Sequence, residues 1–210
     1  MRIVETFESL QGEGIWLGMP SLFIRVAGCN LTCAYCDTAG ARDPAAGCER
    51  SVEDLAALAH QSVSRHVVIT GGEPTLYGEE LVALCATLRR HGKIVTVETN
   101  ATDFVDCNPH LWSLSPKLDA WPDEALAAYL RCGAPVQIKV VVASAEEAWA
   151  ALTRLRAQAL PAEHTFLMPC ARTRAEHAAT LTWLAPLCVA EGVRCAVRLQ
   201  TLLWDNAPGR

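Results

Sequence analysis

Short apolar runs, several of them rich in β-branched residues, alternate with helical patterns along most of the chain. Six runs predict strands, at residues 21–27, 66–70, 93–100, 111–117, 136–142 and 164–171, and a final short run lies at 194–199. Helical patterns occur at 51–63, 79–91, 122–132, 144–158 and from residue 173 onward. Strands joined through helices pair in parallel with right-handed crossovers. The sequence therefore predicts an α/β fold whose sheet is an incomplete parallel barrel of about six strands.

Capping residues set the expected helix boundaries. The sequence Ser-Val-Glu-Asp at 51–54 has the form of a capping box, Ser144 and Thr173 precede helical patterns in a similar way, and Gly92 can end the helix at 79–91. Pro186 lies inside the last helical pattern, where a proline removes a backbone hydrogen bond. We therefore expect the last helix to kink or end early at Pro186.

Three cysteines lie close together after the strand predicted at 21–27. Cys29, Cys33 and Cys36 have the spacing C-x3-C-x2-C. Three thiolates on so short a loop can bind one face of a cubane iron–sulfur cluster and leave its fourth iron open. A closed zinc site needs four ligands, commonly two C-x2-C pairs, and the sequence has no second pair. The spacing favours a cluster, with a zinc-stabilised, non-catalytic binding module as the alternative from another class.

Two glycine-containing motifs accompany the cysteines. Leu10-Gln11-Gly12-Glu13-Gly14 precedes them, and Thr70-Gly71-Gly72-Glu73-Pro74 follows the strand predicted at 66–70. Glycines let the backbone turn tightly and approach a ligand closely. Each motif alone also fits an ordinary turn. Together with the cysteines they indicate one ligand site at the carboxyl ends of the strands, where functional residues of such folds gather.

The cysteine spacing, with Tyr35 just before the third cysteine, resembles the radical S-adenosylmethionine (SAM) superfamily. With both motifs, in this order and in a chain this short, the sequence resembles the 7-carboxy-7-deazaguanine synthase (QueE) family over nearly its whole length. The resemblance implies a radical SAM core fold, a [4Fe–4S] cluster, SAM and Mg²⁺. It also implies the reaction. One-electron cleavage of SAM gives a radical that takes hydrogen from C6 of 6-carboxy-5,6,7,8-tetrahydropterin, and ring contraction with loss of ammonia gives 7-carboxy-7-deazaguanine.

The resemblance also implies roles for residues of this sequence. Cys29, Cys33 and Cys36 would bind the cluster, and Thr38 would bind Mg²⁺. The expected substrate-binding residues are Leu10, Gln11, Gly12, Glu13, Arg25, Thr70 and Pro208. The expected SAM-binding residues are Tyr35, Cys36, Asp37, Gly72, Ser115, Pro116, Lys117, Met168, Pro169, Cys170 and Ala171. We expect no catalytic residue beyond the chemistry that the cofactors supply.

Two cations interrupt apolar runs. Arg25 lies within the strand predicted at 21–27, and a buried cation needs a partner. The resemblance makes Arg25 a clamp for the substrate carboxylate, with an internal salt bridge as the alternative. Lys139, inside the run at 136–142, is expected to face the pocket.

The carboxyl-terminal tail departs from the family pattern. Some members have a histidine where this chain has Gln200 or Leu202, so substrate contacts from the tail rest on the resemblance alone. A second alternative is an activase that installs a glycyl radical on a protein partner, because such enzymes are also short and share the cysteine spacing. The Leu10–Gly14 motif favours the synthase.

Composition limits the class of protein. The 210 residues, 51% hydrophobic and 20% charged, suffice for a single domain over 1–210. A net charge of -5 argues against non-specific nucleic-acid binding, and no apolar run approaches the roughly 20 residues that cross a membrane. The N-terminus lacks a signal-peptide pattern, so we expect a reducing cytoplasm and scattered cysteines buried as small core residues.

The expected partners follow from the same reasoning. A small pterin substrate is expected rather than a nucleic acid or a membrane. An electron donor such as flavodoxin or ferredoxin and assembly as a homodimer are implied by the resemblance.

Overall fold

The computed structural model describes residues 1–158, 160, 162–205 and 207. The strands are β1 (Arg2–Leu10), β2 (Pro20–Val26), β3 (Cys48–Glu49), β4 (His66–Gly71), β5 (Ile94–Thr99), β6 (Leu111–Leu114), β7 (Val136–Val142), β8 (Thr165–Pro169) and β9 (Arg194–Cys195). The α-helices are α1 (Val52–Gln61), α2 (Gly78–Arg90), α3 (Asp123–Arg131), α4 (Ala145–Ala157), α5 (Arg174–Glu191) and α6 (Leu199–Trp204). Short 3-10 helices are η1 (Gly14–Trp16), η2 (Ala39–Arg42), η3 (Pro74–Tyr77) and η4 (Ala162–His164). None of these helices is long and apolar enough to cross a membrane.

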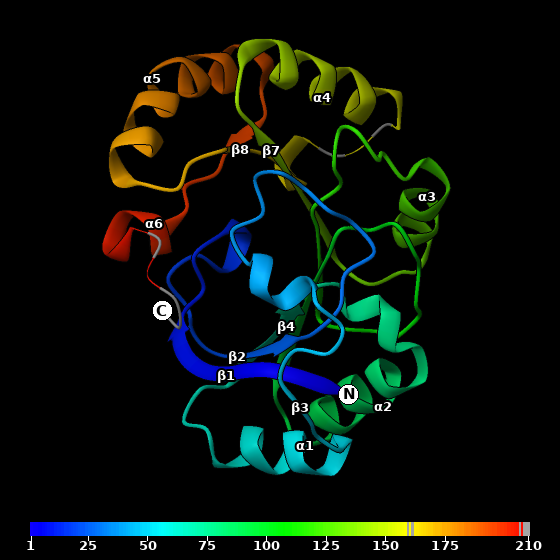
Figure 1. Cartoon of the computed structure of the whole chain (residues 1–210). Coiled ribbons are helices and arrows are strands. Elements are labelled where there is room, and N and C mark those ends of the chain that lie inside the picture. The colour runs from blue at the N-terminus through cyan, green and yellow to red at the C-terminus, as the bar shows by residue number, and fades with distance from the viewer. Residues whose placement is uncertain (159, 161, 206, 208–210) are drawn as a thin grey trace.

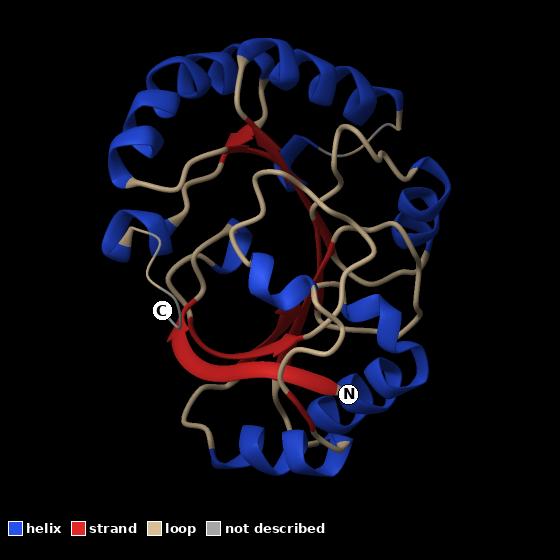
Figure 2. Cartoon of the chain, in the orientation of Figure 1, coloured by secondary structure: helices blue, strands red, loops and turns tan. Residues whose placement is uncertain are grey.

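The strands form one sheet in the order β3-β1-β2-β4-β5-β6-β7-β8-β9. Every neighbouring pair from β2 to β9 is parallel, which confirms the predicted incomplete parallel barrel. The sheet curves into an open arc, with the α-helices around its outer side (Figure 1). Figure 2 shows the same arc as a continuous band of strands that does not close into a ring.

The amino-terminal edge of the sheet differs from the parallel pattern. β1 pairs antiparallel with β2 and with β3. Residues 11–19 connect β1 to β2, and a connection this short allows a hairpin but no parallel crossover. The loosely alternating residues 3–10 thus become an additional strand that extends the barrel.

Helix boundaries follow the capping residues. The Ser51 hydroxyl accepts a hydrogen bond from Asp54 N, and the Asp54 carboxylate accepts one from Ser51 N. Thr173 and Glu176 form the same reciprocal pair at the start of α5. Gly92, with φ +73°, follows α2. The capping boxes expected from the sequence are therefore present.

The expected early end of the last helix at Pro186 is wrong. α5 continues through Pro186 to Glu191. Leu184 and Cys188, on either side of the proline, are buried. Their tertiary packing holds the helix together despite the missing backbone hydrogen bond, because packing supplies most helix stability in a protein.

The final strand expected at 194–199 is also wrong in its extent. Only Arg194 and Cys195 pair with β8, and α6 begins at Leu199. The Leu199 N–H donates to the Gly12 carbonyl oxygen at 2.9 Å. The chain therefore leaves the sheet to contact the Leu10–Gly14 motif instead of extending β9.

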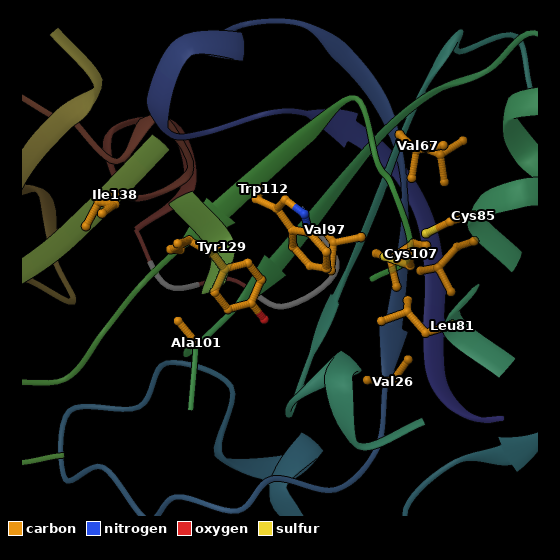
Figure 3. Close-up of a cluster of buried hydrophobic side chains, with 14 of the residues drawn as sticks. Val26, Val67, Leu81, Cys85, Val97, Ala101, Cys107, Trp112, Tyr129 and Ile138 are labelled. Atoms are coloured by element: carbon orange, nitrogen blue, oxygen red, sulfur yellow. The ribbon is translucent and has the colours of Figure 1, made fainter. Parts of the chain in front are cut away.

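The hydrophobic core lies between the sheet and the outer helices. The buried Tyr129 ring of α3 contacts the Trp112 ring of β6 edge-on, with centroids 4.8 Å apart (Figure 3). Tyr129 Oη donates to the Asp103 carbonyl oxygen at 2.6 Å, which satisfies its polar end. Cys85, Cys107 and Cys188 are buried in this core and Cys132 and Cys195 pack against it, as expected. Cys170, also expected in the core, is half-buried and lies outside it.

Candidate active site

A cavity of about 790 Å³ opens at the carboxyl ends of the parallel strands. Among the predicted site residues, its wall includes Leu10, Gln11, Gly12, Glu13, Arg25, Cys29, Cys33, Tyr35, Cys36, Asp37, Thr38, Thr70, Gly72, Ser115, Lys117, Met168, Cys170 and Ala171. Pro116 and Pro169 are buried in the same segments but do not line the cavity, and Pro208 lies outside the described residues. The structure thus brings nearly all of these residues to one cavity, and their binding roles stay predictions.

The three cysteines lie on the loop that follows β2. All three are partly buried and line the cavity. Cys36 N donates to the Cys33 carbonyl oxygen at 3.2 Å, and Leu31 N lies 3.5 Å from Cys29 Sγ. Burial raises the pKa of the Cys33 thiol, and negative charge on Cys36 and Cys29 raises it further. The three cysteine side chains therefore share the wall of one cavity.

This donor set fits one face of a cubane cluster. The described residues contain no group of three His, Cys, Asp or Glu side chains close enough to hold a single metal ion. A cubane does not need such a group, because each thiolate binds a different iron. The three thiols are free of disulfides and can ionise on binding. Cys29, Cys33 and Cys36 are thus able to hold a [4Fe–4S] cluster.

Glu73 fixes the loop between β4 and α2. It is fully buried, and its carboxylate accepts hydrogen bonds from Thr75 N at 3.1 Å, Thr75 Oγ1 at 2.9 Å, Thr99 Oγ1 at 2.6 Å and Asn100 N at 2.7 Å. Burial raises the pKa of Glu73, and these hydrogen bonds act in the opposite direction. The carboxylate thereby ties the Thr70–Pro74 motif to the end of β5.

Gly72 occupies a position where a side chain would not fit. A Cβ there would lie 1.9 Å from the Gly28 carbonyl oxygen, which also accepts a hydrogen bond from Glu73 N at 2.8 Å. Gly28 directly precedes Cys29. The Thr70–Pro74 motif therefore packs backbone to backbone against the start of the cysteine loop.

Lys117 lies in the part of the wall where SAM is expected. Its Nζ donates to Ser115 Oγ at 2.8 Å and lies 6.0 Å from the centre of the Tyr35 ring. Burial lowers the pKa of Lys117 and raises the pKa of Tyr35. A cation here can attract a carboxylate such as that of SAM.

Lys139 and two glutamates form an ion-pair network across the cavity. Lys139 Nζ, on β7, lies 2.7 Å from Glu13 Oε2 and 3.3 Å from Glu98 Oε1, and the lysine side chain is only 3% exposed. Burial favours the neutral form of Glu13, but the charges of Lys139 and Arg198 outweigh it and lower its pKa to about 2. The same pairing raises the pKa of Lys139 against the effect of burial. Lys139 faces the pocket, as the sequence predicts, and is charged.

Glu98 connects the two glycine motifs. Gln11 Nε2 donates to Glu98 Oε1 at 3.2 Å, and Thr70 Oγ1 donates to Glu98 Oε2 at 2.9 Å. Gln11 and Thr70 come from different motifs, and both are predicted to bind the substrate. Glu98 thus holds them in one hydrogen-bonded group at the end of β5.

Arg198 is a site residue that sequence reasoning missed. Its Nε lies 3.3 Å from Glu13 Oε1, its Nη1 donates to the Ala171 carbonyl oxygen at 2.7 Å, and its Nη2 pairs with Asp37 Oδ2. A signal was available, because Arg198 interrupts an apolar run just as Arg25 does. The predicted strand at 194–199 includes Arg198, so its place in the site was not recognised.

Arg25 pairs with a carboxylate of the protein and also lines the cavity. Its Nε lies 2.7 Å from Glu5 Oε1, and its guanidinium carbon lies 5.6 Å from the centre of the Phe7 ring. Arg25 Nη1 donates to Thr38 Oγ1 at 3.4 Å. The internal salt bridge that the sequence left open is therefore present, and the clamp for a substrate carboxylate stays a prediction.

Comparisons with known proteins cover the whole chain. The family model of the radical SAM superfamily matches residues 23–183. A 7-carboxy-7-deazaguanine synthase from Pyrobaculum aerophilum is 37% identical over 217 residues, which cover 100% of this chain and 97% of that protein. Another synthase of this name, from Rhodopirellula baltica, is 34% identical over 226 residues, which cover 99% and 88% of the two chains. The crystal structure of QueE from Escherichia coli matches with a TM-score of 0.71 and 27% identity, over 94% of this chain and 93% of that one.

The alignment with the Pyrobaculum aerophilum synthase extends over the whole chain. It therefore spans the cysteine loop and both glycine motifs. The superfamily match and the two synthases agree with the resemblance found in the motifs. The chain belongs to the radical SAM superfamily and, within it, to the 7-carboxy-7-deazaguanine synthase family.

Proposed function

We propose that this chain is a radical SAM lyase that converts 6-carboxy-5,6,7,8-tetrahydropterin to 7-carboxy-7-deazaguanine with loss of ammonia. One observation carries the proposal. The Leu10–Gly14 motif and the three cysteines line the same cavity, in a chain that aligns over its full length with a named synthase. These relatives favour the synthase over a glycyl-radical activase and over a zinc-stabilised binding module.

The chain has to hold its cofactors and the reacting carbon together and keep water away. Cys29, Cys33 and Cys36 would hold the cluster, and Lys117, which lines the same cavity, would attract the carboxylate of SAM. When bound, these cofactors supply a carbon radical that removes a hydrogen atom from the substrate. Phe7, Leu10, Phe23 and Met168 give the cavity apolar wall that excludes water from this step.

Charged groups of the cavity match the polar groups of the substrate. Arg25 Nε donates to Glu5 and Nη1 donates to Thr38, which leaves three N–H donors of the guanidinium to bind the substrate carboxylate. The pterin ring carries N–H and NH₂ donors. The Glu98 carboxylate can accept from them, because its side chain lines the cavity and is 22% exposed.

Mg²⁺ is proposed at Thr38, following the resemblance. Thr38 Oγ1 donates to Asp37 Oδ1 at 2.8 Å, so two hard oxygen donors are adjacent. Arg25 Nη1, 3.4 Å from Thr38 Oγ1, would repel a divalent cation there. Once a substrate carboxylate draws the guanidinium away, the site becomes suitable for Mg²⁺. Mg²⁺ binding that depends on substrate would support this arrangement.

The remaining partners are proposed from the resemblance. An electron donor such as flavodoxin or ferredoxin would reduce the cluster, and the chain would act as a homodimer in the cytoplasm. The net charge of -5 and the ten cysteines, none of them in a disulfide, are in keeping with a reducing compartment and a small-molecule substrate.

The test is a reaction of the reconstituted protein under anaerobic conditions. Purified protein with a full cluster is incubated with SAM, dithionite, Mg²⁺ and the carboxylated tetrahydropterin, and the product is identified by mass spectrometry. We expect 7-carboxy-7-deazaguanine and ammonia, and neither from a Cys33→Ala variant that cannot hold the cluster. A protein that carries the cluster and cleaves SAM but leaves the pterin unchanged would contradict the proposal.

A further inference from the structure

Arg198 connects the two halves of the proposed site through its own side chain. Asp37 follows Cys36 in the cysteine loop and is expected at SAM, whereas Glu13 belongs to the motif expected at the pterin. Arg198 Nη2 pairs with Asp37 Oδ2, and Arg198 Nε lies 3.3 Å from Glu13 Oε1. One guanidinium therefore contacts a carboxylate from each half.

We propose that Arg198 is a positioning residue that couples binding of the pterin to binding of SAM. It contacts protein groups, so it acts through Glu13 and Asp37 instead of on the reacting atoms. The inference rests on the proposed function, because it takes the pterin and SAM as the two ligands.

The surroundings of Arg198 hold its guanidinium in one orientation. The Arg198 backbone N donates to His177 Nε2 at 3.0 Å, and Nη1 donates to the Ala171 carbonyl oxygen at 2.7 Å. The side chain is only 10% exposed, and ion pairs are stronger where water is excluded. The guanidinium is planar, so its Nε and Nη2 donors keep a fixed spacing. The positions of Glu13 and Asp37 are therefore linked through one rigid group, and ordering the Glu13 carboxylate restricts where Asp37 can lie.

The cysteine loop is the element that such coupling would order. Residues 27–38 form turns and irregular backbone, with no helix or strand of their own. Arg198 holds this loop through Asp37, from across the cavity. When the bound pterin restrains Glu13, the cysteine loop is already partly ordered before SAM binds. SAM binding then costs less conformational entropy of the loop. By linkage, SAM must favour the pterin by the same factor.

Glu13, which Arg198 links to Asp37, is itself restrained by other residues. Gln200 Nε2 donates to Glu13 Oε1 at 2.8 Å, and Lys139 holds the other carboxylate oxygen. Glu13 thus stays ionised and in contact with Arg198 before any ligand binds. The contacts of Arg198 with Glu13 and Asp37 exist in the free protein. The ligands therefore strengthen these contacts instead of creating them.

The experiment measures the coupling directly. Protein with the oxidised cluster, which does not cleave SAM, is titrated with SAM in the absence and presence of 6-carboxypterin, an analogue without a C6 hydrogen to abstract. The reciprocal titration follows pterin fluorescence with and without SAM. For the unsubstituted protein we expect each ligand to tighten the other by the same factor, on the order of tenfold. In Arg198→Gln this factor should fall to about one, whatever the change in either affinity alone.

Two further variants separate coupling from a general structural effect. Arg198→Lys keeps the positive charge but loses the planar guanidinium that contacts two carboxylates at once. We therefore expect an intermediate coupling factor. Arg172 also contacts the cysteine loop, with Nη2 3.2 Å from the Ala34 carbonyl oxygen, but it is exposed and does not reach Glu13. Arg172→Gln should therefore keep the full factor even if SAM binds more weakly.

Several results would overturn the inference. One is a coupling factor of one in the unsubstituted protein, and another is an undiminished factor in Arg198→Gln. If Arg198→Gln does not fold or hold a cluster, an undiminished factor in Arg198→Lys has the same meaning. An unsubstituted protein that makes the deazaguanine product without any coupling would remove the inference and leave the proposed function intact, whereas absence of product would count against the function itself.

Discussion

Lys139 Nζ lies 2.7 Å from Glu13 Oε2, across 126 positions of sequence. Glu13 follows β1 near one edge of the sheet, and Lys139 lies on β7 toward the other. The turn after Glu13 reaches the same strand, because Ile15 N donates to Gln137 Oε1 at 2.8 Å. The Leu10–Gly14 motif therefore crosses the inside of the open arc, where Figure 1 shows its dark blue turn. This crossing places the residues expected to bind the pterin opposite the cysteine loop.

Replacing Lys139 by Met should destabilise the fold strongly. The substitution leaves the carboxylates of Glu13 and Glu98 partly buried without their shared cation. We expect the free energy of unfolding to fall by about 3 to 5 kcal/mol, measured by urea denaturation at pH 7. Lys139→Arg keeps the cation and should lose much less. A Lys139→Met protein as stable as the unsubstituted one would show that the ion pair is not needed to hold the motif on β7.

Replacing Gly72 by Ala should disturb the cysteine loop. The new Cβ would lie 1.9 Å from the Gly28 carbonyl oxygen, so backbone next to Cys29 must shift. We expect a loss of about 1 to 3 kcal/mol in stability and poor cluster incorporation, measured by denaturation and by iron content. Gly40→Ala is the matched control, because no atom lies within 4 Å of a Cβ at that position. Equal iron content in the two variants would contradict the proposed packing.

Replacing Glu73 by Gln should loosen the loop between β4 and α2. The carboxylate accepts four hydrogen bonds, and a glutamine side chain would turn an NH₂ donor toward some of those donors. We expect a destabilisation of about 1 to 3 kcal/mol and weaker SAM binding. Thermal denaturation and SAM titration measure the two effects. Glu49→Gln, at an exposed position on β3, should change neither, and similar behaviour of both variants would argue against a special role for Glu73.

His66 should make stability depend on pH below neutrality. It is fully buried between Ser21 Oγ at 2.7 Å and Thr96 Oγ1 at 2.8 Å, and burial lowers its pKa to about 4 from a usual value of 6.5. Between these values the unfolded chain binds a proton that the folded chain does not. Stability contributed by neutral His66 is therefore complete above pH 6.5 and falls as the pH drops toward 4, by about 3 kcal/mol in total.

Urea denaturation at a series of pH values tests this dependence. A His66→Gln variant serves as the comparison, because it lacks the titrating group while the other histidines remain. The variant should show a flatter decline between pH 6.5 and 4 than the unsubstituted protein. Parallel declines would mean that His66 is protonated in the folded state over this range.

The parallel part of the sheet and most of the cavity wall could be predicted from local patterns. Short apolar runs identified β2 and β4 to β8, the cysteine spacing and glycine motifs identified part of the wall, and the family resemblance added the rest. Such patterns are local, and parallel topology then forces the strand ends to one side of the sheet. The resemblance to the synthase family then added residues of distant strands, such as Met168, to the same site as Cys29.

The features that the sequence did not predict depend on long-range contacts. The end of β9 and the start of α6 follow from the bond between Leu199 N and Gly12 O, which no local pattern encodes. The role of Arg198 depends on the same change of direction, because a strand through 194–199 would place its side chain differently. The continuation of α5 through Pro186 likewise comes from the packing of its neighbours.

The central claim is that the chain removes the C6 hydrogen of a carboxylated tetrahydropterin held beside SAM in the described cavity. The most direct measurement uses substrate labelled with deuterium at C6 and follows the label by mass spectrometry under anaerobic, reducing conditions. The product and ammonia together contain every atom of the substrate, so the hydrogen taken from C6 must be returned in each turnover. The account therefore predicts that deuterium appears on the 5′ carbon of the adenosyl group, in SAM or in 5′-deoxyadenosine, while 7-carboxy-7-deazaguanine accumulates. Unlabelled 5′-deoxyadenosine formed alongside intact labelled pterin would contradict it.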